Sequence, residues 1–281
     1  GCIDASIGLS KVYRAYQDEP VSFTFTEYIT SNTPRIEIEQ FWHPLLDTQK
    51  VVTNSLKMGK PEHKDIILSG PNASGKSMTL KGLCLCILLG QTIGFSPATR
   101  CQFTPFSKIT TYLNITDNLG ENQSLFKAEV VRAQELVSSA QALPDGHFAF
   151  TVMDEIFSST APAEGEAAAY GVAYALAHQP NTISLLATHF AKLTTLPRMT
   201  DGVFKNYKVY VNRRDDGTFE HPFRLEPGRS HQVIALDLMR QEGFDPTILA
   251  YADQFLANHP VVGLNEVRSL IPHLSEGSTN R

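Results

Sequence analysis

The segment SGPNASGKSM, residues 69–78, carries two glycines at fixed positions, followed directly by a lysine and a serine. It lies between the apolar run DIILSG, typical of a strand covered on both faces, and residues 77–90, whose apolar positions follow a helical period. In such a setting, consecutive backbone N–H groups turn inward on a phosphate, with the positive end of the helix behind them. The segment therefore predicts a phosphate site, and the strand–loop–helix context disfavours a plain turn.

Two side chains of this loop have expected roles of their own. Lys76 would reach the β- and γ-phosphates of a nucleotide, and Ser77 would place its hydroxyl on Mg²⁺. The residues expected to contact the nucleotide are Gly70, Pro71, Asn72, Ala73, Ser74, Gly75, Lys76, Ser77 and Met78.

The stretch TVMDEI, residues 151–156, ends an apolar run with two neighbouring carboxylates. A nucleotide loop needs an acidic residue for its metal, and Asp154 at the strand end would hold Mg²⁺ through water. Glu155 faces the other way and would take a proton from the attacking water. Such a pair alone is more often a solvated turn, but the buried run before it and the loop at 69–78 favour the catalytic interpretation.

His189 directly follows the apolar stretch LLAT, which predicts a third strand ending beside the glycine loop. At that place it would sense or polarise the γ-phosphate. A lone histidine is usually structural, and the other histidines are interpreted as structural.

The 281-residue chain has an ordinary globular composition, with 42% apolar and 19% charged residues and no run of 18 or more apolar residues. We expect a soluble protein with no membrane segment, cytoplasmic if its source is prokaryotic and nuclear if it is eukaryotic. With a net charge of −5, the chain lacks the excess of basic residues that is typical of a domain in contact with phosphate backbones. Any nucleic acid is therefore expected to be bound outside this chain. The four cysteines lack zinc spacing and are expected to be reduced thiols.

The predicted elements alternate strand and helix. Strands are predicted at 21–28, 34–41, 65–70, 148–155 and 182–189, and helices at 77–90, 125–143 and 165–178. On the helix at 125–143, one apolar face is expected to hold Phe126, Val130, Ala133, Val137 and Ala140. A hairpin of residues 208–213 and 218–223 around Asp215, Asp216 and Gly217 and two helices near 230–242 and 245–257 follow. The pattern predicts an α/β fold, a mainly parallel sheet flanked by helices with additional antiparallel strands.

Four segments in order, GPNASGKS, DNLGENQSLFKAE, TVMDEI and ATHF, resemble the ATPase domain of the MutS DNA mismatch repair family. The resemblance runs from about residue 3 to residue 256 and includes HPLL at 43–46, TN at 53–54 and GFDPTILAYADQFL at 243–256. The four motifs together are specific, whereas the flanking matches are weaker.

The resemblance implies a P-loop ATPase of the ABC superfamily that uses ATP and Mg²⁺. It also implies a dimer, either a homodimer or one with a paralogous MutS-like subunit, in which Ser124 is offered to the partner's γ-phosphate. Asn72 would approach the γ-phosphate as well. By its own spacing Ser124 is equally a helix N-cap, and this alternative stays open.

The resemblance also suggests a division of the chain. Residues 1–20 would be the end of a lever-type helix, 21–258 the ATPase domain, and 259–281 a weakly ordered tail. Because the chain begins without a methionine, we expect it to be part of a longer protein, with DNA bound through upstream domains absent from this chain.

The chain departs from the family pattern at four places. Where the family has a Gly-Arg-Gly-Thr turn after the acidic pair, this chain has residues 157–160, Phe-Ser-Ser-Thr. Val51 stands at the position of the aromatic that stacks on adenine, Asn118 replaces the second aspartate of an Asp-Asp pair, and Val233-Ile234-Ala235 replaces a Ser-aromatic-Gly segment. These changes leave the phosphate chemistry intact and affect adenine stacking and communication between sites.

Three functions are compatible with these features. The first is ATP binding and hydrolysis that drives DNA clamping in a divergent MutS-like protein. The second is another ABC-type ATPase subunit, for chromosome maintenance or transport, but no Leu-Ser-Gly-Gly-Gln-like signature precedes the acidic strand. The third is a nucleotide-gated dimerisation module without significant hydrolysis, which the altered turn at 157–159 suggests.

Overall fold

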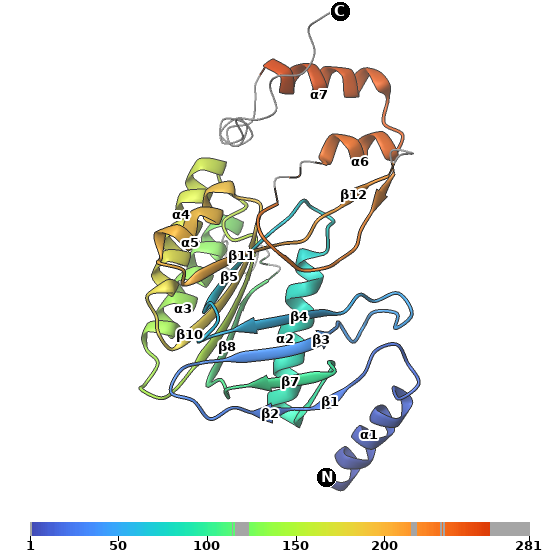
Figure 1. Cartoon of the computed structure of the whole chain (residues 1–281). Helices are drawn as coiled ribbons and strands as arrows, with labels where there is room; N and C mark the ends of the chain where they lie inside the picture. The colour runs from blue at the N-terminus through green and yellow to red at the C-terminus, as the bar shows by residue number, and fades with distance from the viewer. Residues whose placement is uncertain are drawn as a thin grey trace, which may run out of the picture.

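The structure, a computed structural model, describes residues 2–113, 115, 124–214, 218–230, 232 and 234–258. Its main element is a six-stranded sheet with the order β14-β11-β5-β10-β9-β8, parallel except at the edge strand β14 (Figure 1). These strands are β5 (Asp65–Ser69), β8 (Lys108–Tyr112), β9 (Ala149–Asp154), β10 (Thr182–Thr188), β11 (Phe204–Lys208) and β14 (Glu226–Pro227). The prediction of a mixed α/β fold with a mainly parallel sheet is confirmed.

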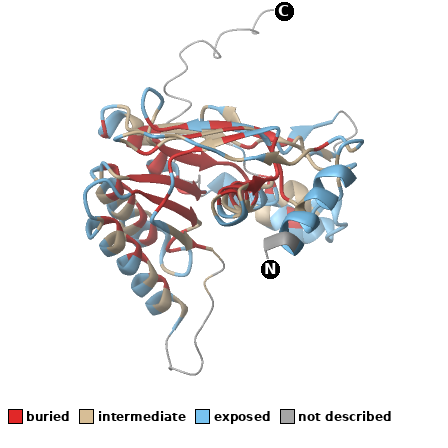
Figure 2. Ribbon diagram, turned by 90° about the horizontal axis from the view of Figure 1, so that it is seen from below, coloured by how far each residue is buried: buried red, intermediate tan, exposed pale blue. Residues whose placement is uncertain are grey.

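The central strands are buried on both faces, as Figure 2 shows in red. In β5, Ile66 and Leu68 pack into one apolar cluster, whereas Ile67 packs into the cluster on the opposite face. Successive side chains of a strand point to opposite sides, so a strand at the centre of a covered sheet needs an unbroken apolar run. This requirement explains the sequence DIILS.

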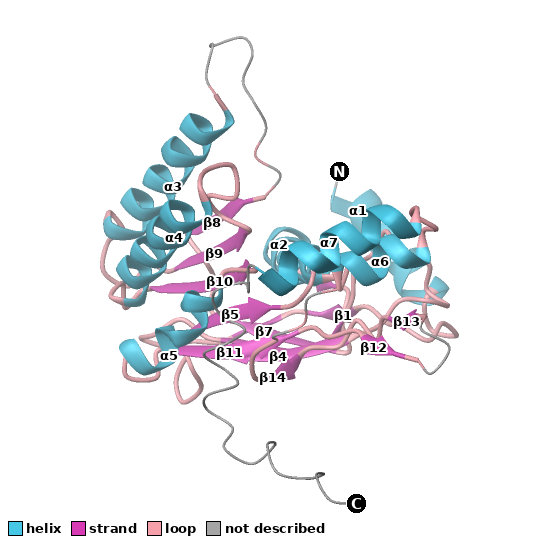
Figure 3. Ribbon diagram, turned by 90° about the horizontal axis from the view of Figure 1, so that it is seen from above, coloured by secondary structure: helices cyan, strands magenta, loops and turns pink. Residues whose placement is uncertain are grey.

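Helices cover both faces of this sheet (Figure 3). One face packs against α2 (Lys76–Ile93), and the other against α3 (Leu125–Gln141), α4 (Pro162–Ala177), η2 (Ala191–Thr195) and α5 (Leu196–Met199). The helix predicted after the glycine loop is therefore α2, which packs on the face of the parallel strands opposite α3 and α4.

A smaller sheet with the order β2-β7-β3-β4 packs against α2. It consists of β2 (Glu27–Tyr28), β3 (Ile36–Phe41), β4 (Asn54–Met58) and β7 (Arg100–Phe103), and β1 (Thr24–Phe25) pairs beside it with β6 (Phe95–Ser96). The predicted strands at 21–28 and 34–41 contain β1, β2 and β3. Strand β4 was missed, although its residues alternate buried and exposed with the period of two that marks a half-buried strand.

Helix α3 is present, but its predicted apolar face is wrong in part. Phe126 and Val130 are each 40% exposed, whereas the buried side of the helix consists of Glu129, Ala133, Leu136 and Ala140. Small residues allow α3 to approach β8 and α4, and Glu129 takes a buried position because polar groups of neighbouring elements bind it.

The last part of the chain adds a short hairpin and two helices. The hairpin pairs β12 (Asn212–Arg213) with β13 (Phe219–Glu220), and its predicted turn at 215–217 lies outside the described residues. The helices are α6 (Ala235–Gln241) and α7 (Pro246–Asn258). Lys208 was assigned to the hairpin but ends β11, which pairs with β5 in the main sheet.

The N-terminal helix is α1 (Cys2–Ala15), whereas the tail at 259–281 lies outside the described residues. The predicted domain boundaries stay predictions. Within the part of the chain that the structure describes, no helix is both long and apolar enough to cross a membrane.

Candidate functional site

The glycine-rich loop connects the end of β5 to the start of α2, as the sequence predicts. Ala73 and Gly75 have φ values of 63° and 97°, so two residues of the loop adopt the left-handed backbone conformation just before the helix. Gly75 is the N-cap of α2 and has no side chain to cap it. The first amides of α2 and the positive end of its dipole therefore face the loop.

Both fixed glycines are required by close contacts. A Cβ atom on Gly70 would lie 2.5 Å from the Val209 carbonyl oxygen and 2.9 Å from Ser74 Oγ. A Cβ atom on Gly75 would lie 2.6 Å from Cδ1 of Phe223. The spacing of the glycines thus reflects close packing against Val209, just after β11, and against Phe223, after the hairpin, as well as backbone conformation.

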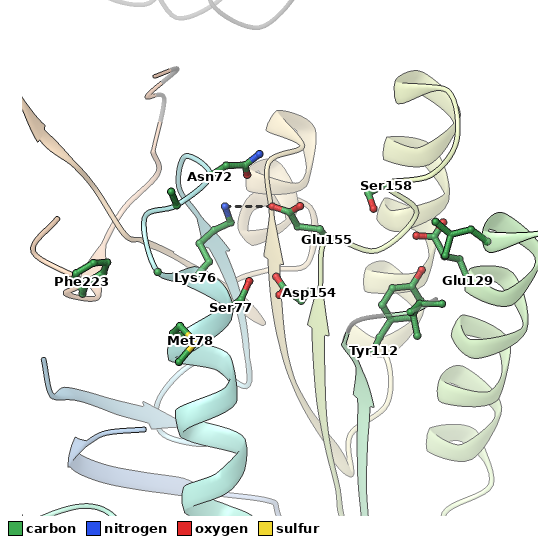
Figure 4. Close-up of a pocket in the computed structure, with 14 residues that line it drawn as sticks. Asn72, Lys76, Ser77, Met78, Tyr112, Glu129, Asp154, Glu155, Ser158 and Phe223 are labelled. Atoms are coloured by element: carbon green, nitrogen blue, oxygen red, sulfur yellow. Dashed lines mark ion pairs between the residues drawn. The ribbon is translucent and has the colours of Figure 1, made fainter. Parts of the chain in front are cut away.

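Lys76 is the buried cation of the loop, with 5% exposure. Its Nζ donates hydrogen bonds to the carbonyl oxygens of Gly70 (2.9 Å) and Pro71 (3.1 Å). The same Nζ lies 3.4 Å from Oε1 of Glu155. The lysine that ends the glycine motif and the second carboxylate of the acidic pair are therefore neighbours in space (Figure 4).

Asp154 ends β9 beside the first turn of α2 (Figure 4). Its Oδ1 is buried and has no hydrogen-bond partner among the described residues. Burial raises the pKa of Asp154, and a hydrogen bond with Ser77 opposes this rise. A buried carboxylate oxygen without a partner marks a place where an additional positive group would be stabilised.

Glu155 lies one residue beyond Asp154, with φ 49°, and its N–H donates to the Ala187 carbonyl oxygen at 3.0 Å. Its Oε1 lies 3.8 Å from Nδ1 of His189. The interaction with His189, followed by the charge of Lys76, holds the pKa of Glu155 below its usual value. Glu155 therefore carries a negative charge at neutral pH and is only partly exposed.

These groups border a cavity of about 590 Å³. Its lining residues are Asn72, Ala73, Gly75, Lys76, Ser77, Met78, Tyr112, Ile115, Leu125, Glu129, Asp154, Glu155, Ser158 and Phe223. The predicted nucleotide contacts Gly70, Pro71 and Ser74 are not among these lining residues. His189 is not among them either, and its ring packs against Phe190.

Ser124 is the N-cap of α3 and accepts a hydrogen bond from the Lys127 N–H at 3.4 Å. The open alternative of a helix cap is thus confirmed. The next residue along α3, Leu125, lines the cavity. The role of Ser124 toward a partner subunit stays a proposal, and Asp117 and Asn118 lie outside the described residues.

Sequence reasoning missed Phe223, Tyr112 and Glu129 as cavity residues. Phe223 has φ 53° and reaches the loop because Asn54 fixes its backbone: Asn54 Nδ2 donates to the Phe223 carbonyl oxygen at 3.0 Å. Asn54 also accepts from the Leu225 N–H at 2.7 Å. The sequence pattern holds no signal for this contact, although the TN pair at 53–54 belongs to the family resemblance.

Comparison with known proteins gives a consistent result. The family model described as MutS domain V matches residues 66–259. A DNA mismatch repair protein MutS from Synechococcus sp. (strain JA-2-3B'a(2-13)) is 29% identical over 271 residues, which cover 93% of this chain and 29% of that protein.

Two further relatives carry the same name. The protein from Carboxydothermus hydrogenoformans is 24% identical over 257 residues, which cover 90% of this chain and 30% of that protein. The protein from Desulforapulum autotrophicum is 28% identical over 230 residues, which cover 79% of this chain and 25% of that protein. The chain thus spans less than a third of the length of these relatives.

Proposed function

Because the chain belongs to the MutS domain V family, we propose that it is the Mg²⁺-dependent ATPase domain of a MutS-like protein that acts on DNA. The observation that supports this best is the convergence of Lys76, Ser77, Asp154 and Glu155 on one cavity at the end of the parallel sheet. Ligands of open α/β sheets bind at the carboxyl ends of the strands. A P-loop fold of the ABC type is part of the proposal.

The triphosphate would lie on the loop at 70–78, with Lys76 Nζ moving from its own loop carbonyls to the β- and γ-phosphates. Ser77 and Asp154 fit a magnesium ion, since both offer oxygen and Asp154 Oδ1 is buried without a partner among the described residues. The described residues include no cluster of three or more His, Cys, Asp or Glu that could hold a metal, so water and phosphate would complete the coordination. The ion would neutralise charge that develops on the phosphates.

Glu155 is the proposed general base. Its lowered pKa keeps it ionised, and the distance of 3.4 Å between its Oε1 and Lys76 Nζ supports a role near the expected γ-phosphate. His189 would hold Glu155 in place and sense the γ-phosphate, and Asn72 at the cavity wall would approach the same phosphate.

Phe223 is the proposed platform for the adenine base. Its ring is 41% exposed, lines the cavity and packs on Gly75, and it supplies an aromatic face in a chain that has Val51 at the family's aromatic position. Phe223→Ala is expected to weaken ATP binding about 2- to 12-fold, the equivalent of one aromatic stacking contact. Binding of inorganic tripolyphosphate, measured by calorimetry, should not change.

The matched control is Phe25→Ala, which removes an exposed ring from β1, away from the cavity. An equal loss of affinity for ATP and tripolyphosphate in Phe223→Ala would contradict base stacking.

We further propose that the chain works as a dimer with a second copy or a paralogous subunit, and that upstream domains bind DNA. Helix α7 presents Ile248, Tyr251 and Phe255 on one exposed face, with exposures of 52%, 69% and 62%. Such an apolar stripe fits the core of a subunit interface. The N-terminus of α3 would bring Ser124 to the partner's nucleotide.

Tyr251→Asp is expected to raise the dissociation constant of an ATP-bound dimer more than about tenfold, because a charge would replace an aromatic anchor. Sedimentation velocity with Mg²⁺-ATP over a range of protein concentrations measures this change. Gln254→Glu, which adds a charge to another exposed position of α7, serves as the control and should dimerise normally. Equal dimerisation of both variants would exclude this stripe from the interface.

The whole proposal is tested by equilibrium ATP binding and phosphate release with and without Mg²⁺. Failure to bind ATP would contradict it. If ATP binds and a dimer forms but saturating Mg²⁺ yields no phosphate, the chain is instead a nucleotide-gated dimerisation module.

A further inference from the structure

Glu129 is a charged residue of α3 that is only 3% exposed. Its Oε2 accepts a short hydrogen bond from the hydroxyl of Ser159. Its carboxylate also faces the hydroxyl of Tyr112, and the two groups interact electrostatically (Figure 4). Tyr112 comes from β8, so three elements meet at this carboxylate. A carboxylate is costly to bury unless hydrogen bonds satisfy it, and here both partners are neutral hydroxyl groups.

These contacts lead to the turn that connects β9 to α4. Tyr112 Oη accepts the N–H of Phe157 at 3.3 Å, and Ser159 belongs to the same turn. From the other side, a Cβ atom on Gly165 would lie 2.5 Å from the Phe157 carbonyl oxygen, so α4 packs directly on the turn. Side chains from β8 and α3 and the backbone of α4 therefore hold residues 155–160.

The turn needs this support because its conformation is unfavourable. Glu155 and Phe157 have φ values of 49° and 58°, in the left-handed region that residues other than glycine rarely adopt. Such conformations persist only where the surroundings fix them. Glu155 is the residue whose carboxylate the turn places 3.4 Å from Lys76 Nζ.

We propose that Glu129 is a positioning residue for ATP hydrolysis: through Tyr112 and Ser159 it fixes the turn that aims Glu155. This inference rests on the proposed function. Glu129 also lines the cavity, but its hydrogen bond from Ser159 and its contact with the Tyr112 hydroxyl direct it toward the turn. It should therefore affect the chemical step and leave the binding of Mg²⁺-ATP unchanged, unlike a ligand of the metal or the phosphates.

The test compares Glu129→Gln and Ser159→Ala with the parent chain. Both variants should lower kcat, by up to about 100-fold for Glu129→Gln, because small displacements of a reacting group cost this much. The dissociation constant of Mg²⁺-ATP should stay within about twofold. Hydrogen exchange of the peptide covering residues 155–160, measured by mass spectrometry without nucleotide, should become faster in both variants.

Ser159→Ala changes an exposed residue by a single oxygen atom and so keeps the test valid if Glu129→Gln folds poorly. The matched control is Glu166→Gln, which alters a partly buried carboxylate of α4 that accepts the Lys192 N–H at 2.7 Å. It should leave kcat and the exchange of 155–160 unchanged.

Two results would overturn the inference. The first is an active parent chain whose kcat is unchanged in both variants. The second is hydrogen exchange of residues 155–160 that is no faster in either variant than in the parent. A large loss of ATP affinity in Glu129→Gln would instead make Glu129 a ligand of the nucleotide or its metal. If the parent chain binds no ATP, the proposed function itself is wrong. In that case, the hydrogen exchange of residues 155–160 alone decides whether Glu129 holds the turn.

Discussion

Glu155→Gln is expected to lower the rate constant of ATP hydrolysis about 10²- to 10⁴-fold and to leave ATP affinity nearly unchanged. Glutamine keeps the shape of the side chain but cannot accept a proton, and removal of a general base costs a factor of this size. Glu155 Oε1 lies 3.4 Å from Lys76 Nζ and 3.8 Å from His189 Nδ1, so the substitution leaves the surrounding geometry largely in place. Single-turnover phosphate release with Mg²⁺-ATP measures the rate constant.

The pH dependence gives the same experiment a second readout. The pKa of Glu155 lies below its usual value of 4.5, first because of His189 and then because of Lys76. The base should therefore stay ionised from pH 8 to pH 5, and protonation of Glu155 should not limit hydrolysis in this range. His189→Ala removes the main cause of the shift, so the acid limb of the rate profile should move to higher pH.

The control is Glu135→Gln, which neutralises an exposed carboxylate of α3 that pairs with Arg132 on the surface. Its hydrolysis rate should equal that of the parent chain. If Glu155→Gln hydrolyses ATP at the parent rate, Glu155 is not the base, although nucleotide binding by the loop would be unaffected.

The part of the site that could be predicted is the part encoded locally. Residues 65–78 contain the strand, the two glycines, the lysine and the start of the helix in one continuous segment, and each has its own chemical reason. The acidic pair and His189 could be added because the carboxyl ends of parallel strands meet at one edge of a sheet. The pairing of β10 with both β5 and β9 is the feature that brings them together.

The part that could not be predicted depends on contacts between distant segments. Phe223 reaches the loop through Asn54, 169 positions away in the chain, and no local pattern encodes that hydrogen bond. Glu129 shows the opposite failure: apolar periodicity favours Phe126 and Val130 as the inner face of α3, yet the carboxylate is the buried residue. An argument from periodicity assigns every charged residue to the exposed face of a helix. It fails for a buried carboxylate, because the groups that donate hydrogen bonds to it lie on other elements.

Lys64→Met is expected to destabilise the fold by about 3–5 kcal/mol at pH 7, a large share of the 5–15 kcal/mol typical of a folded domain. Lys64 Nζ lies 3.0 Å from Oδ2 of Asp65, which is fully buried, and donates hydrogen bonds to the carbonyl oxygens of Leu176, Gln179 and Thr182 at 2.9–3.0 Å. The lysine thus joins the start of β5 to the end of α4 and to β10. Without it, the Asp65 carboxylate keeps the hydrogen bond that the Ser184 N–H donates to its Oδ1 at 2.7 Å. Urea unfolding followed by circular dichroism measures the difference.

The pH dependence of this loss has a definite sign, and the controls separate it from a general packing defect. Burial raises the pKa of Asp65 from 3.8 to about 6, against the opposing charge of Lys64. Between these values the folded state binds more protons, so the contribution of Asp65 to stability is present below about pH 3.8 and lost as pH rises through 6. Removal of Lys64 raises the pKa of Asp65 further, so the deficit of Lys64→Met should shrink as pH falls toward 6, because the unpaired carboxylate of the variant then becomes protonated. The double variant Lys64→Met with Asp65→Asn should recover much of the loss, because no buried charge remains unpaired. Lys57→Met removes the exposed partner of a surface ion pair with the partly buried Glu37 and should change stability by less than about 1 kcal/mol. A similarly small effect of Lys64→Met at pH 7 would show that the buried pair does not hold these elements together.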